Sequence, residues 1–498
     1  MTGTTQALHD LPAHALLRAY RERSLSPVEV MHELLAHVQR WEPALGATYL
    51  LRPEAALAQA RASEARWLRG EPAGLLDGVP ATVKDNIATR GDPTPVGTAA
   101  TPQVAAPLDA PPAARLREAG AILFAKTTMP DYGMLSSGLS SLHGNTFNPW
   151  DPDKTPGGSS AGAGAAAAAG YGPLHVGTDI GGSIRLPAGW CGIFGLKPSL
   201  GRVPIDPPYT GRCAGPMTRS VADAALMMQA LSLPDARDSM GLPHQDIAWS
   251  GFDMDPAQVR GLRIGLLLDA GCGLPLQPRV RAVVEQAAAW LESAGAHIEI
   301  IQPWLTRDML DGLDHFWRMR SHVEMQSLPD AQRRVVLPFI RDWADSAGSI
   351  TATQLFVASQ QSHLLRVATV RATAAFDYVL SPVAPITAFP AHLPSPTNDP
   401  LRPLEHIAFT VPYNMSEQPA ASVPCGHDGQ LPIGVQIAGR RFDDLGVLRL
   451  SRVLEQLRPP QPAWPQPAWP QPLPPGRGTG DSEDGAQARA RAVPATPA

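Results

Sequence analysis

Residues 155–204 read TPGGSSAGAGAAAAAGYGPLHVGTDIGGSIRLPAGWCGIFGLKPSLGRVP, and this is the most unusual stretch of the sequence. Two Gly-Gly-Ser elements end at Ser159 and Ser183, 24 residues apart, with an Ala/Gly run between them. Two glycines before a serine let the backbone approach a substrate closely and turn its N–H groups toward one point, as an oxyanion hole requires. The small residues of 161–170 favour a tightly packed helix, for which Ser160 is a suitable N-cap.

Helix and strand patterns alternate on both sides of this stretch. Residues 75–91, LLDGVPATVKDNIATRG, are a short apolar segment that ends in a polar turn, and residues 113–130 read as a helix followed by a strand. The segments 262–268 and 280–302 repeat this order far along the chain. Such alternation predicts an α/β sheet that collects strands from distant segments, which favours one large domain.

We expect a domain over residues 1–458 and a low-complexity tail over 459–498. Along the domain we expect four parts: a helical N-terminal part at 8–71, a core at 72–232, a mostly helical, pocket-lining region at about 306–371, and a C-terminal part at 372–458. The 306–371 region is rich in Trp, Met and His, which more often form a core than a ligand site. The tail repeats PQPAW at 460–464 and 465–469. We expect this tail to be disordered, with polyproline II geometry that can dock on a partner.

Composition and charge exclude several classes of protein. Hydrophobic residues make up 44% and charged residues 17% of the 498 residues, as in globular proteins. The net charge is −5 and no long Lys/Arg block occurs, so we expect no nucleic-acid partner. Cys191, Cys213, Cys272 and Cys425 are scattered singly, so neither a zinc site nor a disulfide framework is indicated. No run of about 18 apolar residues and no signal-peptide pattern occurs, which predicts a cytoplasmic protein without a membrane partner.

A serine hydroxyl is a poor nucleophile unless a neighbouring group removes its proton. Neither Gly-Gly-Ser element lies in a G-x-S-x-G turn, and the nearest histidine, His175, lies in an apolar run typical of a buried core. A buried lysine can replace histidine, because burial lowers its pKa toward neutrality. Lys84, in GVPATVKDNI, best fits burial at a strand end. On the residues alone Lys126, Lys154 and Lys197 remain alternatives, and a surface position is the ordinary expectation for each.

The stretch from Gly157 to Pro198 resembles the Gly/Ser-rich hallmark of the amidase signature family. Further segments of the chain are similar to family motifs in the same order: DGVPATVKDNI, GAILFAKTTMPDYG, FNPWD, GPMTRSVADAA, FDYVLSPVAP, FTVPYNMSEQPAASVPCG and LPIGVQIAGRRFDD. Together they cover roughly residues 8–457. The resemblance implies an α/β fold in a single domain, with a large central mixed β-sheet flanked by helices on both faces.

The same resemblance implies a catalytic relay of three side chains. Ser183 in GGSIR matches the nucleophile, Ser159 matches a bridging serine, and Lys84 in VKDN matches the base. It also implies that the peptide between Gly158 and Ser159 is cis. In the implied mechanism, Lys84 removes a proton from Ser159, which removes one from Ser183, and the Ser183 oxygen attacks the amide carbon.

Further residues receive roles from the resemblance around this relay. Asp179 and Arg185 are expected to order the loop through polar contacts. Met134 and Leu135 match positions that face the acyl group of the substrate in relatives. The oxyanion hole is matched by four backbone N–H groups, those of Ile180, Gly181, Gly182 and Ser183.

The implied activity is that of an amidase, a hydrolase that splits the C–N bond of a linear amide into a carboxylate and ammonia or an amine. The substrate is then a small-molecule amide, and no metal or cofactor is required. The same family includes the glutamine-hydrolysing A-type subunit of a tRNA-dependent amidotransferase, although no strong basic patch for tRNA is present. A third alternative is a catalytically silent scaffold that presents its PQPAW tail. Among oligomeric states, a homodimer is the first to test.

Overall fold

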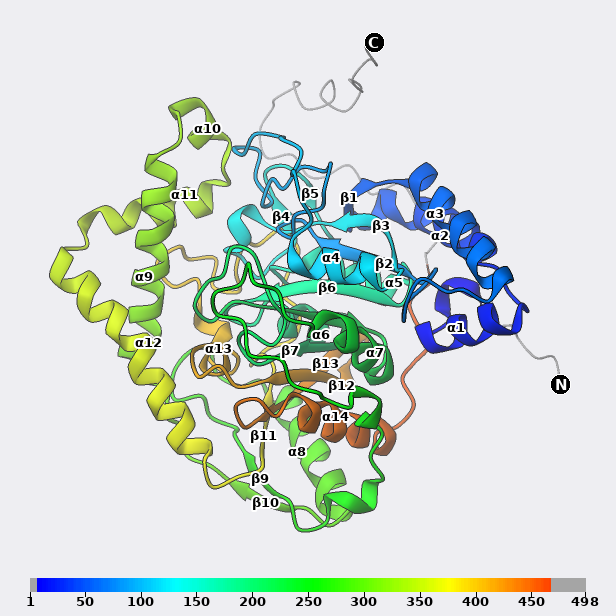
Figure 1. Ribbon diagram of the computed structural model, residues 1–498. Helices are drawn as coiled ribbons and strands as arrows, with labels where there is room; N and C mark the ends of the chain where they lie inside the picture. The colour runs from blue at the N-terminus through cyan, green and yellow to red at the C-terminus, as the bar shows by residue number, and fades with distance from the viewer. Residues whose placement is uncertain (1–6, 467–498) are drawn as a thin grey trace. The chain divides into compact units, whose positions relative to one another are not determined.

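The computed structural model describes residues 7–466 (Figure 1). Within these residues eleven strands form one sheet, in the order β1 (Thr48–Leu51), β3 (Ile122–Thr127), β2 (Pro80–Lys84), β6 (Leu174–Asp179), β8 (Cys213–Thr218), β7 (Phe194–Lys197), β12 (Ala420–Asp428), β13 (Leu431–Gly439), β11 (Tyr378–Pro382), β9 (Arg263–Leu266) and β10 (His297–Ile300). The pairs β2–β3, β2–β6, β9–β11 and β9–β10 are parallel, whereas the other neighbours are antiparallel. The predicted mixed sheet, with strands from distant segments, is confirmed.

The helices of the described residues are α1 (Ala13–Glu22), α2 (Pro27–Leu45), α3 (Pro53–Arg69), α4 (Pro111–Glu118), α5 (Ala161–Ala169), α6 (Arg185–Cys191), α7 (Val221–Leu231), α8 (Pro278–Ser293), α9 (Arg307–Gln326), α10 (Asp330–Val335), α11 (Pro338–Asp345), α12 (Ala352–Thr373), α13 (Val411–Met415) and α14 (Asp444–Leu457). Short 3-10 turns lie at η1 (Leu8–Asp10), η2 (Asp131–Gly133), η3 (Trp249–Phe252), η4 (Pro256–Val259), η5 (Ser346–Ser349) and η6 (Glu405–Ile407). A separate two-stranded pair joins β4 (Leu139–Ser140) to β5 (Gly144–Asn145).

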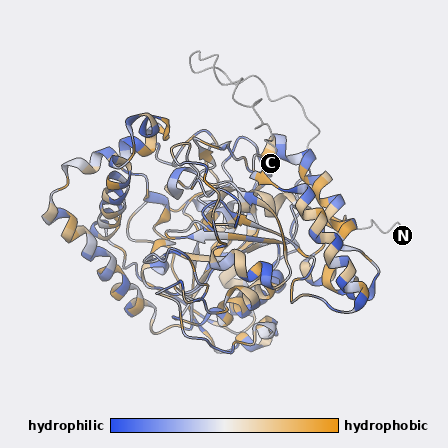
Figure 2. Ribbon diagram, turned by 45° about the horizontal axis from the view of Figure 1, so that its top comes forward, coloured by the Kyte–Doolittle hydropathy of each residue, from blue (hydrophilic) through white to orange (hydrophobic). Residues whose placement is uncertain are grey.

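Helices cover both faces of the sheet, as predicted. Successive side chains of a regular strand point to opposite faces, and Leu123 and Phe124 of β3 show this. Leu123 belongs to the hydrophobic cluster that includes residues of α4, α7, α8 and α14, whereas Phe124 packs with residues of α2 and α5. Figure 2 shows apolar colours along the central strands and alternating polar and apolar residues along the outer helices.

The N-terminal part combines the expected helices with a strand. Ser26 caps α2 in a capping box with Glu29, and Pro27 occupies the first turn, as the sequence indicates. The structure adds β1 between α2 and α3, where the sequence pattern indicated helix only. Gly46, at φ +60°, ends α2, and the Thr-Tyr-Leu-Leu run that follows pairs with the edge of β3.

Region 306–371 is helical, as predicted, and forms what we call the helical arm, α9–α12. In Figure 1 the arm lies beyond one end of the strands, with α9 and α12 packed together and α12 against α13. Trp317, Met325 and Trp343 are buried in its hydrophobic cluster, as expected for core residues. Met319 and His322 are half-buried.

The first PQPAW repeat lies within the described residues and the second does not. Trp464 of the first repeat is half-buried, with the guanidinium carbon of Arg219 4.2 Å from its ring centroid and the Trp150 ring centroid at 6.2 Å. The predicted disordered tail therefore has an ordered first segment, and its remainder, 467–498, lies outside the described residues. Among residues 7–466, no helix is both long and apolar enough to cross a bilayer.

Candidate active site

Lys84 ends strand β2, and its side chain is fully buried. The Nζ atom donates to Ser159 Oγ at 2.8 Å, to Ser160 Oγ at 3.0 Å and to Thr178 Oγ1 at 3.0 Å. Burial lowers the pKa of Lys84 to about 7, because desolvation disfavours the ammonium; the negative charge of Asp179 acts in the opposite direction. A large share of Lys84 is therefore neutral near pH 7, which a general base requires.

Ser159 lies in a tight backbone segment before α5. The Gly158–Ser159 peptide is cis, as the family resemblance implied. Residue 158 must be glycine, because a Cβ atom there would lie 2.7 Å from the backbone oxygens of both Leu135 and Ser137. This close packing fixes the Ser159 hydroxyl beside Lys84.

Ser160 occupies the N-cap position of α5, but its side chain makes no capping bond, which differs from the sequence expectation. Its hydroxyl donates to the Thr178 carbonyl at 3.1 Å and accepts from the Thr178 N–H at 3.2 Å. These bonds join the start of α5 to β6. Ser160 and Thr178 are thus polar neighbours of Lys84 that the sequence did not single out.

Ser183 lies in the loop between β6 and α6 and is 8% exposed. Its carbonyl accepts from the Ser160 N–H at 3.2 Å, which ties this loop to the start of α5. Within residues 7–466 the Ser183 hydroxyl forms no hydrogen bond, so none joins it to Ser159. Catalytic hydrogen bonds are often long without substrate and tighten in the complex.

Asp179 and Arg185 order this loop, as expected. Both side chains are buried, and they pair through Nε–Oδ2 and Nη2–Oδ1 contacts of 2.9 Å each. Burial alone raises the pKa of Asp179, but the charge and hydrogen bonds of Arg185 outweigh it and hold that pKa well below its usual range. Because Asp179 ends β6 and Arg185 begins α6, this bidentate pair holds the two ends of the Ser183 loop together.

Three of the four expected oxyanion donors are free of protein partners in the described part of the chain. The Gly182 N–H donates to Asp179 Oδ1 at 2.7 Å, whereas the N–H groups of Ile180, Gly181 and Ser183 have no acceptor there. Gly182 has φ +130°, and a Cβ atom on it would lie 2.6 Å from Thr410 Oγ1. The loop therefore needs glycine at 182 to keep this conformation.

Two carboxamides from the C-terminal part complete the support of Arg185. Arg185 donates to Gln436 Oε1 at 2.8 Å and to Asn414 Oδ1 at 2.6 Å, and Asn414 Nδ2 donates to the Asp179 carbonyl at 3.2 Å. Sequence reasoning missed both residues, because they lie more than two hundred positions away. Their only signal was their place inside two quoted motifs, FTVPYNMSEQPAASVPCG and LPIGVQIAGRRFDD.

The competing basic residues do not meet the serines. Lys126 and Lys197 are also buried, which differs from the surface position expected for them, but each donates to a backbone carbonyl, at 3.0 and 2.8 Å. Lys154 is half-buried. His175 is a satisfied core histidine, as predicted, bonded to a threonine hydroxyl of β2 and to a backbone carbonyl. Of the four lysines considered, Lys84 alone bonds to Ser159.

Met134 and Leu135 follow η2, close to the relay. A Cβ atom on Gly133 would lie 3.2 Å from Ser159 Oγ, so this segment backs directly onto Ser159. Met134 is half-buried and its Sδ atom is 3.4 Å from Arg320 Nη2, whereas Leu135 is buried. From the helical arm, the Trp317 ring approaches within 3.5 Å of a Cβ placed on Gly181.

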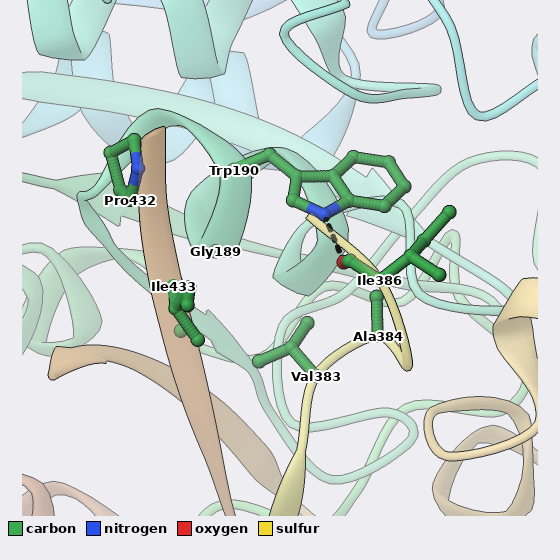
Figure 3. A pocket seen from close by; sticks show the side chains of 8 residues that line it. Gly189, Trp190, Val383, Ala384, Ile386, Pro432 and Ile433 are labelled. Carbon is green, nitrogen blue, oxygen red and sulfur yellow. Dashed lines mark hydrogen bonds between the residues drawn. The ribbon is translucent and has the colours of Figure 1, made fainter. Parts of the chain in front are cut away.

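A small cavity lies beside α6 and is lined by Gly189, Trp190, Val383, Ala384, Ile386, Pro432, Ile433 and Gly434 (Figure 3). Trp190 Nε1 donates to the Ile386 carbonyl at 3.0 Å across it. Its volume is about 10 Å³, which holds one water molecule at most. None of Lys84, Ser159 and Ser183 lines it, so it is a packing gap beside α6 and not the active site.

Comparison with known proteins identifies the family of the chain. The sequence model of the family Amidase matches residues 29–448. The chain is 34% identical to the A subunit of the glutamyl-tRNA(Gln) amidotransferase of Chloroflexus aggregans, over 90% of this chain and 97% of that protein. It is equally identical, with the same coverage, to the protein of the same name from Geobacter metallireducens.

Solved structures extend the likeness to amide-hydrolysing enzymes. A bacterial aryl acylamidase of the amidase signature family superposes with a TM-score of 0.83 at 29% identity, over 91% of this chain and 97% of that chain. The 6-aminohexanoate cyclic dimer hydrolase gives a TM-score of 0.81 at 26% identity, over 91% and 98%. With the family match across most of its length and a shared fold, the chain belongs to the amidase signature family.

Proposed function

We propose that this protein is an amidase that hydrolyses a C–N amide bond through an acyl-enzyme on Ser183. Ser159 serves as the bridging acid and base, and Lys84 as the terminal base. The observation that carries the proposal is the 2.8 Å hydrogen bond from a fully buried Lys84 to Ser159, with the pKa of Lys84 lowered to about 7. No other lysine among residues 7–466 contacts either serine.

The reaction begins when substrate brings the Ser183 hydroxyl to Ser159. Neutral Lys84 accepts the Ser159 proton, Ser159 accepts the Ser183 proton, and Ser183 Oγ attacks the carbonyl carbon. The free N–H groups of the loop stabilise the oxyanion. Ser159 then protonates the departing amine and regains a proton from Lys84. Water next loses a proton to the relay and attacks the acyl carbon, and the carboxylate is released as Ser183 Oγ takes that proton back.

Within the loop we assign the oxyanion hole to the N–H groups of Ile180, Gly181 and Ser183. The Gly182 N–H, also expected there, donates to Asp179 and so supports the loop instead. Thr410 Oγ1 donates to the Gly181 carbonyl at 2.6 Å, which restrains the peptide that follows. Donors held in advance stabilise a transition state at little reorganisation cost.

A second candidate function is glutamine hydrolysis as the A-type subunit of an amidotransferase. The observation in its favour is the 34% identity to curated proteins that carry that name. The relay chemistry is the same in both candidates. They differ in substrate and in dependence on companion subunits.

Turnover by the purified chain separates these candidates. We expect release of amine from aryl or aliphatic amides by the chain alone, with glutamine a poor substrate. Glutamine as the only substrate, or activity that requires companion subunits, favours the second candidate. A folded chain that hydrolyses no amide, with or without residues 459–498, would instead fit a silent scaffold.

A further inference from the structure

Two arginines meet at the turn that precedes β8. The Arg212 guanidinium donates to the Pro207 carbonyl, and the Arg212 N–H donates to the Tyr209 carbonyl at 3.0 Å. From the helical arm, the guanidinium carbon of Arg320 lies 4.8 Å from the centroid of the Tyr209 ring. Tyr209 thus contacts both Arg212 and Arg320, which are more than a hundred residues apart in the sequence.

Arg212 lies beside the buried end of the relay. It lines a small cavity together with Thr178, whose hydroxyl accepts from Lys84. The carbonyl of the preceding residue, Gly211, accepts from Asn414 at 3.1 Å, and Asn414 also bonds to Asp179. The backbone at Arg212 is therefore held by the same Asn414 side chain that supports the Ser183 loop through Asp179.

Arg320 also contacts the segment that follows η2. Its Nη2 atom is 3.4 Å from Met134 Sδ, and Met134 follows the glycine that backs onto Ser159. On the same face of α9, one turn earlier, Trp317 approaches Gly181 of the Ser183 loop. Arg212 thus lies near Thr178, a hydrogen-bond partner of Lys84, and Arg320 contacts the segment that backs onto Ser159.

Little negative charge compensates these two cations within the described residues. In residues 7–466 no carboxylate lies within ion-pair distance of Arg212, while Arg320 has only Glu324 at 3.6 Å, with half of the Glu324 side chain exposed. Burial lowers the pKa of Arg212, and the charge of Arg320 lowers it further; Asp238 and Asp206 oppose this more weakly. By contrast, the buried arginines Arg185, Arg202 and Arg318 each have an aspartate partner.

A half-buried guanidinium without a counterion is costly unless a ligand supplies the charge. We propose that Arg212 and Arg320 bind a carboxylate of the substrate, so that the enzyme prefers amides that carry a negative charge near the scissile bond. The planar donors of arginine suit a carboxylate in two-point contact. This inference rests on the proposed amidase function, because it names the substrate class for the same site.

Two matched pairs of anilides test the charge preference. In one pair the charge is on the acyl side: succinanilic acid against the anilide of 4-methylpentanoic acid, in which an isopropyl group replaces the carboxylate. In the other it is on the amine side: 4-acetamidobenzoate against 4-isopropylacetanilide. The readout is the ratio of kcat/KM for the charged and the neutral member.

We expect the wild-type ratio to exceed about 10 in at least one pair, and to fall on the order of 10- to 100-fold in Arg320→Gln and in Arg212→Gln. Arg320→Lys, which keeps the charge, retains part of the preference. Arg371→Gln, an exposed arginine near the end of α12, is the matched control and keeps the wild-type ratio. Thermal unfolding of each variant identifies any that fail to fold.

Calorimetric titration of the four compounds into Ser183→Ala measures the same preference without turnover. Tighter binding of a charged member, lost when Arg320→Gln is added, supports the anion site even if no anilide is hydrolysed, in which case the amidase proposal alone fails. Neutral members bound and hydrolysed as well as the charged ones, in both pairs, overturn the anion site and leave the amidase proposal standing. The anion site is also overturned if the ratio of kcat/KM for the charged and the neutral anilide is the same in the wild type, Arg320→Gln and Arg212→Gln.

Discussion

The Lys84 relay and the helical arm differ in how their side chains are held. Lys84, Ser159 and Ser183 are 0%, 4% and 8% exposed and lie on or next to strands of the central sheet. The arm reaches the same site with the long side chains of Trp317 and Arg320, and much of its outer surface is apolar and exposed, including Phe356 at 66%. The three residues of the proposed relay are thus held in the buried interior.

This difference suggests a division of labour. Side chains fixed by packing and hydrogen bonds keep reacting atoms aligned, which a proton relay requires. Residues on an outlying helix can change without disturbing the sheet, and so can alter which amide fits. Variants in the relay should therefore affect every substrate alike, whereas variants in the arm should affect substrates unequally.

Replacing the nucleophile should produce the largest effect. Ser183→Ala is expected to lower kcat by at least about 10,000-fold for every amide hydrolysed, because no other group can form the acyl-enzyme. Its hydroxyl makes no hydrogen bond in residues 7–466, so the thermal unfolding midpoint should stay within a few degrees of wild type. Steady-state kinetics and calorimetry measure both; a variant that keeps a tenth of wild-type activity would contradict the assignment.

Removing the base should have the next largest effect. Lys84→Met is expected to lower kcat/KM by about 100- to 10,000-fold, because proton transfer is lost in the transition state. Lys126→Met is the matched control, since Lys126 is also buried with its pKa lowered to about 8 by desolvation, but it donates to a backbone carbonyl. If Lys84→Met and Lys126→Met lower kcat/KM equally, the loss comes from removing a buried lysine and not from removing the contact with Ser159, which would contradict the assignment of Lys84 as base.

Acidification should mimic loss of the base. The relay acts only when Lys84 is neutral, so kcat/KM should fall as pH decreases through about 7, by tenfold per pH unit well below it. The pH profile of the wild type, measured with a substrate that does not titrate in this range, checks the prediction. A rate that stays constant from pH 5 to pH 9 would contradict a lysine base.

The arm should show the smallest and most selective effect. Trp317→Phe is expected to change kcat/KM by about 10-fold or less, in opposite directions for small and bulky amides, because the ring lies against the Ser183 loop at Gly181. Trp343→Phe is the control: it is buried in the arm and bonds to Asp314 at 2.8 Å. Trp343→Phe should lower the free energy of unfolding and leave the ratio of kcat/KM between small and bulky amides unchanged. If Trp317→Phe changes kcat/KM equally for all amides, the arm does not act selectively on substrates.

The sequence singled out the residues of the proposed relay more readily than their surroundings, for a physical reason. Gly-Gly-Ser elements signal close backbone approach within a few residues, so Ser159 and Ser183 could be found locally. The partners of Lys84 include Thr178, and those of Arg185 include Asn414 and Gln436. These contacts depend on how strands from both halves of the chain align, which no local pattern encodes.

The fold followed the same rule. Alternating helix and strand patterns predicted an α/β sheet with strands from distant segments, and the family resemblance implied that this sheet is mixed. The strand β1 was missed, because its four residues carry too little periodicity to stand out between two helices. Residue type also failed to separate Lys84 from Lys126 and Lys197, since all three are buried. The resemblance of VKDN to the family motif selected Lys84, and the hydrogen bond to Ser159 distinguishes it in the structure.

Covalent labelling tests the central claim most directly. The purified protein is treated with a fluorophosphonate, digested, and the modified residue is located by mass spectrometry. We expect a single adduct on Ser183 that is absent from Ser183→Ala and forms far more slowly in Lys84→Met. An adduct on any other residue, or hydrolysis of amides that continues after Ser183 is fully modified, would contradict the Lys84–Ser159–Ser183 relay.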